Sequence, residues 1–209
     1  MKITKLGHSC VLVETEDRVG LFDAGGWSDR NLIGAVKHVD RIVYTHEHPD
    51  HFDIKILGSL LVRFPEAHVV CNQEIKKIII DAGIDTTTRE ETNCTRKFLS
   101  PHEDLPVPRT TPPTENGYHF KDIFTHPGDS QSFTETKKVL AMPFIGPWGK
   151  TGDSIAKVIE LKPEYVLPIH DWHYTDEAKQ WLQNLLETVL SQYDIKVLPN
   201  SNGQVIEIR

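Results

Sequence analysis

Cysteine is scarce in this chain, and that scarcity excludes one way of holding a small fold together. The 209 residues include three cysteines, Cys10, Cys71 and Cys94, an odd number at wide spacing. They form no CxxC pair, so the sequence contains neither a disulfide framework nor a zinc-finger grouping. A chain of this length buries enough apolar surface to fold without such cross-links. We predict free thiols in a reducing compartment, with Cys10 and Cys71 acting as small buried apolar side chains.

Long apolar runs and a surplus of basic residues are also missing. No stretch approaches the roughly 18 apolar residues that cross a bilayer, and the N-terminal segment MKITKLGHSCVLVE lacks the features of a signal peptide. The sequence therefore predicts a cytoplasmic protein without a membrane partner. The formal net charge is −7, so nucleic acid is not an expected partner, although bound metal ions could supply positive charge locally.

Apolar runs and turn residues alternate along the chain in a pattern that indicates one α/β domain, residues 1–209. Apolar runs predict strands at 2–6, 9–15, 18–23, 41–45, 68–71, 96–100, 117–120, 122–126, 137–144 and 165–169. Capping residues and helical spacing predict helices at 28–37, 53–64, 72–83, 151–162 and 175–192. The segments 84–95 and 108–116 are polar and predict loops. The last two apolar runs flank Asn-Ser-Asn-Gly, which predicts a closing hairpin over 194–208.

The segment THEHPDH, residues 45–51, crowds metal-ligand side chains into one turn after a predicted strand. In an extended backbone, His46 and His48 project to the same side because side chains alternate along a strand. The proline that follows prevents a helix, and the turn directs Asp50 and His51 elsewhere. The pattern H-x-H-x-D-H is thus suited to two neighbouring metal ions, and a histidine-rich surface turn is the plain alternative.

Two ions need more ligands than this segment supplies. His102, Asp129 and His170 each follow a predicted strand, and strand ends can converge at one edge of a sheet. These three residues are the leading additional ligands. His119 and His126 compete with His102 for the same role. As alternatives, His119 alternates with Tyr118 and Phe120 within a predicted strand, and His126, three residues before Asp129, would support a ligand from behind.

The motifs GHSC, FDAGG, THEHPDH, SPH, HPGDS and LPIH occur in this order. Together they resemble the metallo-β-lactamase superfamily of metal-dependent hydrolases, and most of all its compact ascorbate-6-phosphate lactonase-like branch. The resemblance extends over nearly the whole chain, from Lys2 to Arg209. It implies a four-layer αβ/βα sandwich, in which two mixed β-sheets are flanked by helices and a dinuclear site lies at one edge.

The resemblance also implies a role for each candidate residue. The implied metal ligands are His46, His48 and His102 for the first ion, Asp50, His51 and His170 for the second, and Asp129 as the bridge between them. Asp23 would accept the free N–H of a ligand imidazole and orient it. His8 would lie near the mouth of the pocket, where it would bind substrate or transfer protons. Asp50 would also take the proton of the nucleophile.

The implied ligands include no thiolate, a set that suits Zn, Mn or Fe, and we expect two divalent ions per chain with zinc first. Such ions make hydroxide available at neutral pH. We therefore expect hydrolysis of an ester, lactone or phosphoester in a small-molecule substrate. Ser9 and Ser130 lack the G-x-S-x-G setting of a nucleophilic serine. The rival functions are a phosphodiesterase or nuclease on the same fold and a non-catalytic metal-binding protein.

Aromatic residues flank several of these motifs. In PFIGPWGKTGDS, Trp148 offers a flat apolar face and Lys150 could contact an anion, although an ordinary loop explains the segment equally well. Trp172 and His173 follow His170 and would either line the pocket or pack beneath the last long helix. The sequence does not decide between a monomer and a homo-oligomer.

Overall fold

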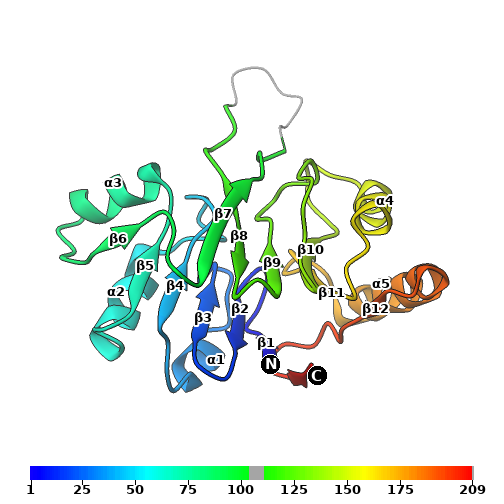
Figure 1. Cartoon of the computed structure of the whole chain (residues 1–209), viewed down its shortest axis with the longest axis horizontal. Coiled ribbons are helices and arrows are strands. Elements are labelled where there is room, and N and C mark those ends of the chain that lie inside the picture. The colour runs from blue at the N-terminus through cyan, green and yellow to red at the C-terminus, as the bar shows by residue number, and fades with distance from the viewer. Residues whose placement is uncertain (104–110, 209) are drawn as a thin grey trace.

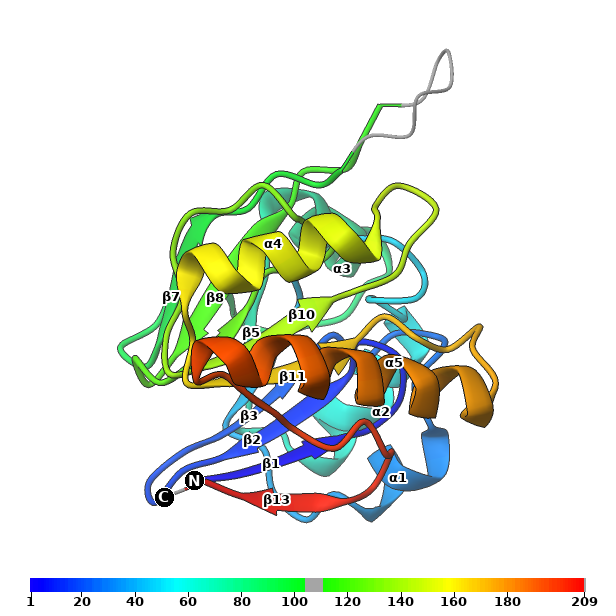
Figure 2. The same cartoon turned by 90° about the vertical axis from the view of Figure 1, so that its right-hand side faces the viewer.

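The computed structural model describes residues 1–103 and 111–208, in which two β-sheets form the centre of a layered α/β fold (Figure 1). The first sheet has the strand order β13-β1-β2-β3-β4-β5-β6, and the second has the order β12-β11-β10-β9-β8-β7. Helices α1, α2 and α3 cover the outer face of the first sheet, and α4 and α5 cover that of the second (Figures 1 and 2). This is the predicted sandwich of two mixed sheets flanked by helices. Part of the predicted loop 108–116 and Arg209 lie outside the described residues.

The first sheet begins as an antiparallel meander and continues with parallel strands. Its strands are β1 (Lys2–Lys5), β2 (Val11–Glu14), β3 (Val19–Phe22), β4 (Arg41–Val43), β5 (His68–Val70), β6 (Thr88–Arg89) and β13 (Val205–Glu207). Its helices are α1 (Arg30–Ala35), α2 (Ile54–Arg63) and α3 (Gln73–Asp81). The short strand β6 lies in the segment 84–95 that the sequence predicts to be a loop.

The second sheet repeats this arrangement, with an antiparallel part followed by parallel strands. Its strands are β7 (Thr95–Leu99), β8 (Asn116–Phe120), β9 (Phe124–His126), β10 (Val139–Pro143), β11 (Tyr165–Ile169) and β12 (Lys196–Val197). Its helices are α4 (Thr151–Leu161), α5 (Asp176–Leu190) and the 3-10 turn η1 (Ser191–Tyr193). Between the sheets, side chains such as Phe22 and Val43 pack against Phe120, Phe124 and Leu167, so the two inner faces share one core.

Side-chain caps begin the helices close to where the sequence predicts them. Asp53, Asn72 and Thr175 each accept a hydrogen bond from a backbone N–H in the first turn of α2, α3 and α5. The first helix is shorter than predicted, because Asp29 rather than Ser28 is its cap and accepts from the N–H groups of the second and third helical residues.

The predicted closing hairpin is wrong. Strand β12 pairs in parallel with β11 in the second sheet, whereas β13 pairs with β1 in the first sheet. The chain between them crosses from one sheet to the other and is fixed there by side-chain and backbone contacts to β1. Lys5 donates from Nζ to Oδ1 of Asn200 at 2.5 Å, and its carbonyl accepts the N–H of Gly203 at 2.8 Å.

Candidate metal centre

The histidine-rich segment forms a tight turn directly after β4. The N–H groups of His51 and Phe52 both donate to the carbonyl of His48, at 2.9 and 2.8 Å. Gly25 lies against this turn so closely that a Cβ on it would fall 2.1 Å from the carbonyl oxygen of Asp50. The FDAGG motif therefore requires glycine here, because any side chain would push the turn away from β3.

The second sheet contributes the other candidate ligands. His102 follows β7, Asp129 follows β9 and His170 follows β11. All three side chains reach the turn after β4, so the cluster lies where the edges of the two sheets meet. The sequence predicts this convergence of strand ends, and the structure brings all seven predicted metal ligands together.

The potential ligand atoms fall into two groups, each with its atoms within 4.8 Å of one another. One group contains His46, His48, His102 and Asp129, and the other contains His8, Asp50, His51 and His170. The first coincides with the predicted first set plus the predicted bridge. The second coincides with the predicted second set plus His8.

Asp129 connects the two groups. Its Oδ2 lies 3.9 Å from Nε2 of His46 and 3.5 Å from Nε2 of His102. The same oxygen is 3.4 Å from Nε2 of His170, and Oδ1 is 3.0 Å from Nε2 of His51. One carboxylate thus faces imidazoles of both groups, the geometry that a bridging ligand requires.

Four of the imidazoles are held from behind and present their other nitrogen inward. The Nδ1 atoms lie next to neighbouring oxygens: His46 to Thr45 Oγ1 at 3.0 Å, His51 to Asp23 Oδ2 at 2.8 Å, His102 to the Glu103 carbonyl at 2.6 Å and His170 to the Ile145 carbonyl at 2.6 Å. Their four Nε2 atoms are buried and have no hydrogen-bond partner among the described residues. Ligand histidines are typically fixed in this way, and inward-facing lone pairs fit a cation.

Burial and neighbouring charges shift the pKa values of these groups. Burial lowers the pKa of His46 well below its ordinary value, which keeps the imidazole neutral. Burial acts to raise the pKa of Asp129, but His170 and His51 outweigh it and hold that pKa well below the usual range. Although burial opposes it, the charge of Asp129 raises the pKa of His170 to about 9. A cation entering the cluster therefore competes with a proton on His170.

Asp23 occupies the position from which the sequence predicts that it orients a ligand. Its Oδ2 lies 2.8 Å from Nδ1 of His51 and accepts the Thr45 hydroxyl at 2.8 Å, and Oδ1 accepts the N–H of Thr45 at 2.9 Å. The backbone of Asp23 is left-handed, with φ of 44°. This conformation is unfavourable for a residue with a side chain, and it occurs at sites where surrounding contacts enforce it.

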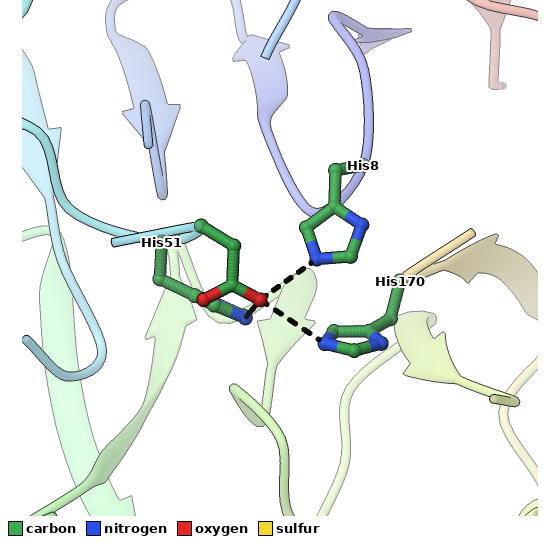
Figure 3. A group of neighbouring side chains, drawn as sticks. His8, His51 and His170 are labelled. Atoms are coloured by element: carbon green, nitrogen blue, oxygen red, sulfur yellow. Dashed lines mark hydrogen bonds and ion pairs between the residues drawn. The ribbon is translucent and has the colours of Figure 1, made fainter. Parts of the chain in front are cut away.

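His8 is more deeply enclosed than a residue at the mouth of a pocket, the place expected from the sequence. It is only 1% exposed, and its Nε2 lies 3.1 Å from Oδ2 of Asp50, beside His51 and His170 (Figure 3). Because Nδ1 accepts the backbone N–H of Trp172 at 3.3 Å, Nε2 carries the proton and donates it to Asp50. Burial lowers the pKa of His8 to about 4, so the ring is neutral at pH 7.

The two competing histidines are not among the grouped ligands, although Nδ1 of His126 lies 3.7 Å from Oδ2 of Asp23, behind His51. His119 stacks on Phe98 with ring centroids 4.4 Å apart, and its nitrogens contact Thr125 and Glu135. His126 is buried with its Nε2 2.9 Å from the carbonyl of Ser9. Neither belongs to the two ligand groups, whereas His102 does.

Glu115 lies at the site although no pattern in the sequence indicates it. It is buried, its Oε1 accepts the N–H of Asp129 at 3.1 Å, and its Oε2 lies 3.1 Å from Nδ1 of His46. Burial, reinforced by the charge of Asp129, raises the pKa of Glu115 well above its ordinary value. Gly128, with φ of 71°, approaches Glu115 so closely that a Cβ would fall 2.6 Å from the carboxyl carbon. The polar, proline-rich segment before Glu115 gives no signal of this role.

The chain is similar in sequence to one family model and to two curated proteins. The family model described as Metallo-beta-lactamase superfamily matches residues 3–52. Protein Rv0786c of Mycobacterium tuberculosis is 26% identical over 97% of this chain and 99% of its own length. UPF0173 protein PF0020 of Pyrococcus furiosus is also 26% identical, over 88% of this chain and 91% of its own.

Solved structures share the fold at low sequence identity. A structure named as a putative metal-dependent hydrolase from Parabacteroides distasonis superposes with a TM-score of 0.71 at 18% identity, over 94% of this chain and 90% of its own. Igni18, named as a metallo hydrolase from Ignicoccus hospitalis, gives a TM-score of 0.66 at 16% identity, over 100% and 99%. In the part of the chain that the structure describes, every helix is too short or too polar to cross a membrane. Residues 3–52 thus match the metallo-β-lactamase superfamily model, the two relatives are similar over most of their length, and the solved structures share the fold.

Proposed function

We propose that the protein is a metal-dependent hydrolase that uses two divalent ions. The observation that carries this proposal is the convergence of four buried Nε2 atoms on Asp129, each ring being fixed from behind through its Nδ1. Left without a cation, these lone pairs and the carboxylate would carry a large desolvation cost. The ligands proposed are His46, His48 and His102 for one ion, Asp50, His51 and His170 for the other, and Asp129 for both.

When bound, two such ions would supply a Lewis acid and would activate water at neutral pH. The chain's own residues position this chemistry. Asp129 lies between the two ligand groups. Asp23 and Thr45 hold the rings of His51 and His46 through their Nδ1 atoms, and Glu115 accepts the N–H of Asp129. In Asp50, Oδ2 contacts His8, His51 and His170, whereas Oδ1 has no hydrogen bond or ion pair within residues 1–103 and 111–208. We assign Oδ1 the role of accepting the nucleophile's proton.

The substrate class that we favour is a small-molecule ester, lactone or phosphoester, with zinc ahead of manganese or iron. The lactonase-like branch and a cytoplasmic location are part of this proposal. A phosphodiesterase is the second candidate, because a structure named as a diphosphatase from the PhnP family shares the fold with a TM-score of 0.64. Within the described ranges, no lysine or arginine forms an ion pair with a candidate ligand, so the proposed ions would be the main contact for a phosphoryl oxygen.

The test is elemental analysis of tag-free protein purified without added metal or chelator, followed by hydrolysis assays. We expect two transition-metal equivalents per chain, and cleavage of esters or lactones that stops on chelation and returns with metal. Preferential cleavage of bis(p-nitrophenyl) phosphate would favour the phosphodiesterase. Protein with no metal and no uptake of Zn or Mn would overturn the proposal. Two bound ions with no hydrolysis of any of these substrates would favour a non-catalytic metal-binding protein.

A further inference from the structure

Three of the four tryptophans in the chain lie beside the metal centre, on three separate segments. Trp27 follows the FDAGG motif, Trp148 lies in the loop between β10 and α4, and Trp172 lies between β11 and α5. We refer to these three side chains as the tryptophan rim.

Trp148 contacts both halves of the metal centre. Its ring centroid is 5.2 Å from that of His170 and 6.1 Å from that of His102. Gly146 makes room for the ring, because a Cβ there would fall 2.5 Å from it. The loop is thus shaped to place this indole over the boundary between the two ligand groups.

Trp27 and Trp172 form the other part of the rim. Their rings stack with centroids 4.8 Å apart and an interplanar angle of 24°. The Trp27 ring also meets His8 edge-on at 4.9 Å, and the backbone N–H of Trp172 donates to His8. Trp27 is nevertheless 40% exposed and Trp172 57% exposed. The stack therefore offers an open aromatic surface next to the metal centre.

Single exposed apolar side chains are ordinary on protein surfaces. Here three large flat side chains surround a polar cluster, the combination typical of a small-molecule site in which polar groups fix orientation and apolar walls supply contact area. Within the described residues, the candidate ligands form no ion pair with lysine or arginine. The tryptophan rim therefore offers a substrate aromatic contact area beside the candidate ligands, and Lys150, two residues after Trp148, is exposed in the same loop.

We infer that the tryptophan rim recognises a planar apolar group attached to the carbonyl that is hydrolysed. This inference rests on the proposed function, because the ions would hold the carbonyl or the product carboxylate while the indoles hold the apolar group. Aromatic pairs prefer offset or edge-to-face contact, so a flat aryl group fits the rim better than a saturated ring of similar size.

The test compares three carboxylates, which represent hydrolysis products, by calorimetric titration into the metal-loaded protein. The probes are acetate, cyclohexylacetate and phenylacetate. We expect phenylacetate to bind about tenfold more tightly than cyclohexylacetate, equivalent to about 1.4 kcal/mol, and acetate to bind most weakly. Equal affinity for phenylacetate and cyclohexylacetate, or tighter binding of acetate, would overturn the inference.

Substitutions identify the surface responsible. Trp27→Ala, Trp148→Ala and Trp172→Ala should each reduce the preference for phenylacetate, and Trp172→Ala keeps the backbone N–H that contacts His8. Trp181→Ala is the matched control, because Trp181 is 64% exposed on α5 and is not in contact with the site histidines. A preference that survives all three substitutions, or that is lost equally in Trp181→Ala, would place recognition elsewhere.

Metal content measured on the same samples separates the two proposals. Two bound ions without a preference for phenylacetate would contradict recognition by the tryptophan rim but would leave the proposal of a metal-dependent hydrolase intact. A wild-type protein that takes up no metal would overturn both.

Discussion

Two buried clusters of charged side chains meet at consecutive residues, and they differ in where their positive charge comes from. His170 points into the metal centre, whereas Asp171 points to the opposite side, where its Oδ2 lies 2.7 Å from Nζ of Lys5. Lys5 is fully buried and also donates to Asn200. This second cluster therefore contains its own cation, supplied by β1.

The metal centre contains carboxylates without a permanent cation. Asp23, Asp50, Glu115 and Asp129 all lie at or beside the histidines, and within the described residues none of the four pairs with lysine or arginine at the site. A buried cluster that holds its own counter-charge serves the fold, whereas one that gathers negative charge and imidazole lone pairs is arranged for a cation from outside. The predictions that follow test this distinction.

The largest effect is expected for Asp129→Ala, because Asp129 faces both ligand groups. We expect this variant to remain folded, to bind at most one ion per chain, and to lose metal affinity by more than about 100-fold, above the range for residues that only support a ligand. Elemental analysis and circular dichroism check this. Two tightly bound ions with retained hydrolysis would rule out the bridge.

The Lys5 cluster should respond in stability rather than in metal content. Lys5→Met leaves the buried Asp171 with only Lys179, whose Nζ is 3.8 Å from its Oδ2. Removing one member of a buried ion pair costs about 3–5 kcal/mol of unfolding free energy, and we expect the lower end of that range here. The double variant Lys5→Met/Asp171→Leu should recover much of that loss. Urea denaturation measures both. An unchanged midpoint in the single variant would show that the pair contributes nothing.

The same lysine should impose a pH dependence on stability. Burial lowers the pKa of Lys5 from 10.5 to about 8, so the unfolded chain binds more protons than the folded one between these values. The unfolding free energy should therefore rise with pH from about 8 to about 10.5, by at most about 3 kcal/mol. The slope should be absent from the Lys5→Met/Asp171→Leu variant, and an identical slope in both proteins would assign it to other groups.

His102 and His119 allow the metal centre to be compared with an ordinary buried histidine. His102→Ala should weaken one ion by about 100-fold or more, whereas His119→Ala should leave metal affinity within about twofold, because His119 contacts Phe98, Thr125 and Glu135 instead. Competition with a chromogenic chelator measures both. The reverse ranking would move the ligand to His119.

The smallest effect is expected at His8, which donates to Asp50. His8→Ala should weaken the second ion by about tenfold, the lower end of the range for residues that orient a ligand. His8→Gln should weaken it less, since its amide N–H can donate to the same carboxylate. Equal losses in both variants would show that the N–H donated to Asp50 is not what supports the second ion.

Much of the site could be predicted because it is encoded locally. The turn after β4 carries four candidate ligands within six residues, and its position after an apolar strand fixes where they emerge. Three more ligands also follow predicted strands: His102, Asp129 and His170. They could be predicted because residues at strand ends can meet at one edge of a sheet. The alternation of short apolar runs with capped helices predicts an α/β domain, whereas the arrangement in two mixed sheets was implied by the resemblance of the motifs to the metallo-β-lactamase superfamily.

What the sequence could not give depends on contacts between distant segments. Glu115 reaches His46 and Asp129 from a polar loop without any periodic pattern. His8 is enclosed by Trp27 and Trp172, which lie far apart in the chain. The prediction of a C-terminal hairpin was wrong because turn residues carry no information about distant sheet edges. In the structure β12 pairs with β11 and β13 pairs with β1.

The division of the ligands between the two sheets has a mechanical consequence. His46, His48, Asp50 and His51 extend from the first sheet, whereas His102, Asp129 and His170 extend from the second. Ions held by both sets would tie His46–His51 to His102, Asp129 and His170, which follow it by about 50 to 120 residues, in a chain whose three cysteines are free. Such a tie restricts the unfolded chain as a cross-link does and adds to folding stability with metal concentration. The ions proposed for hydrolysis would then also stabilise the contact between the two sheets, and chelation would remove that stabilisation.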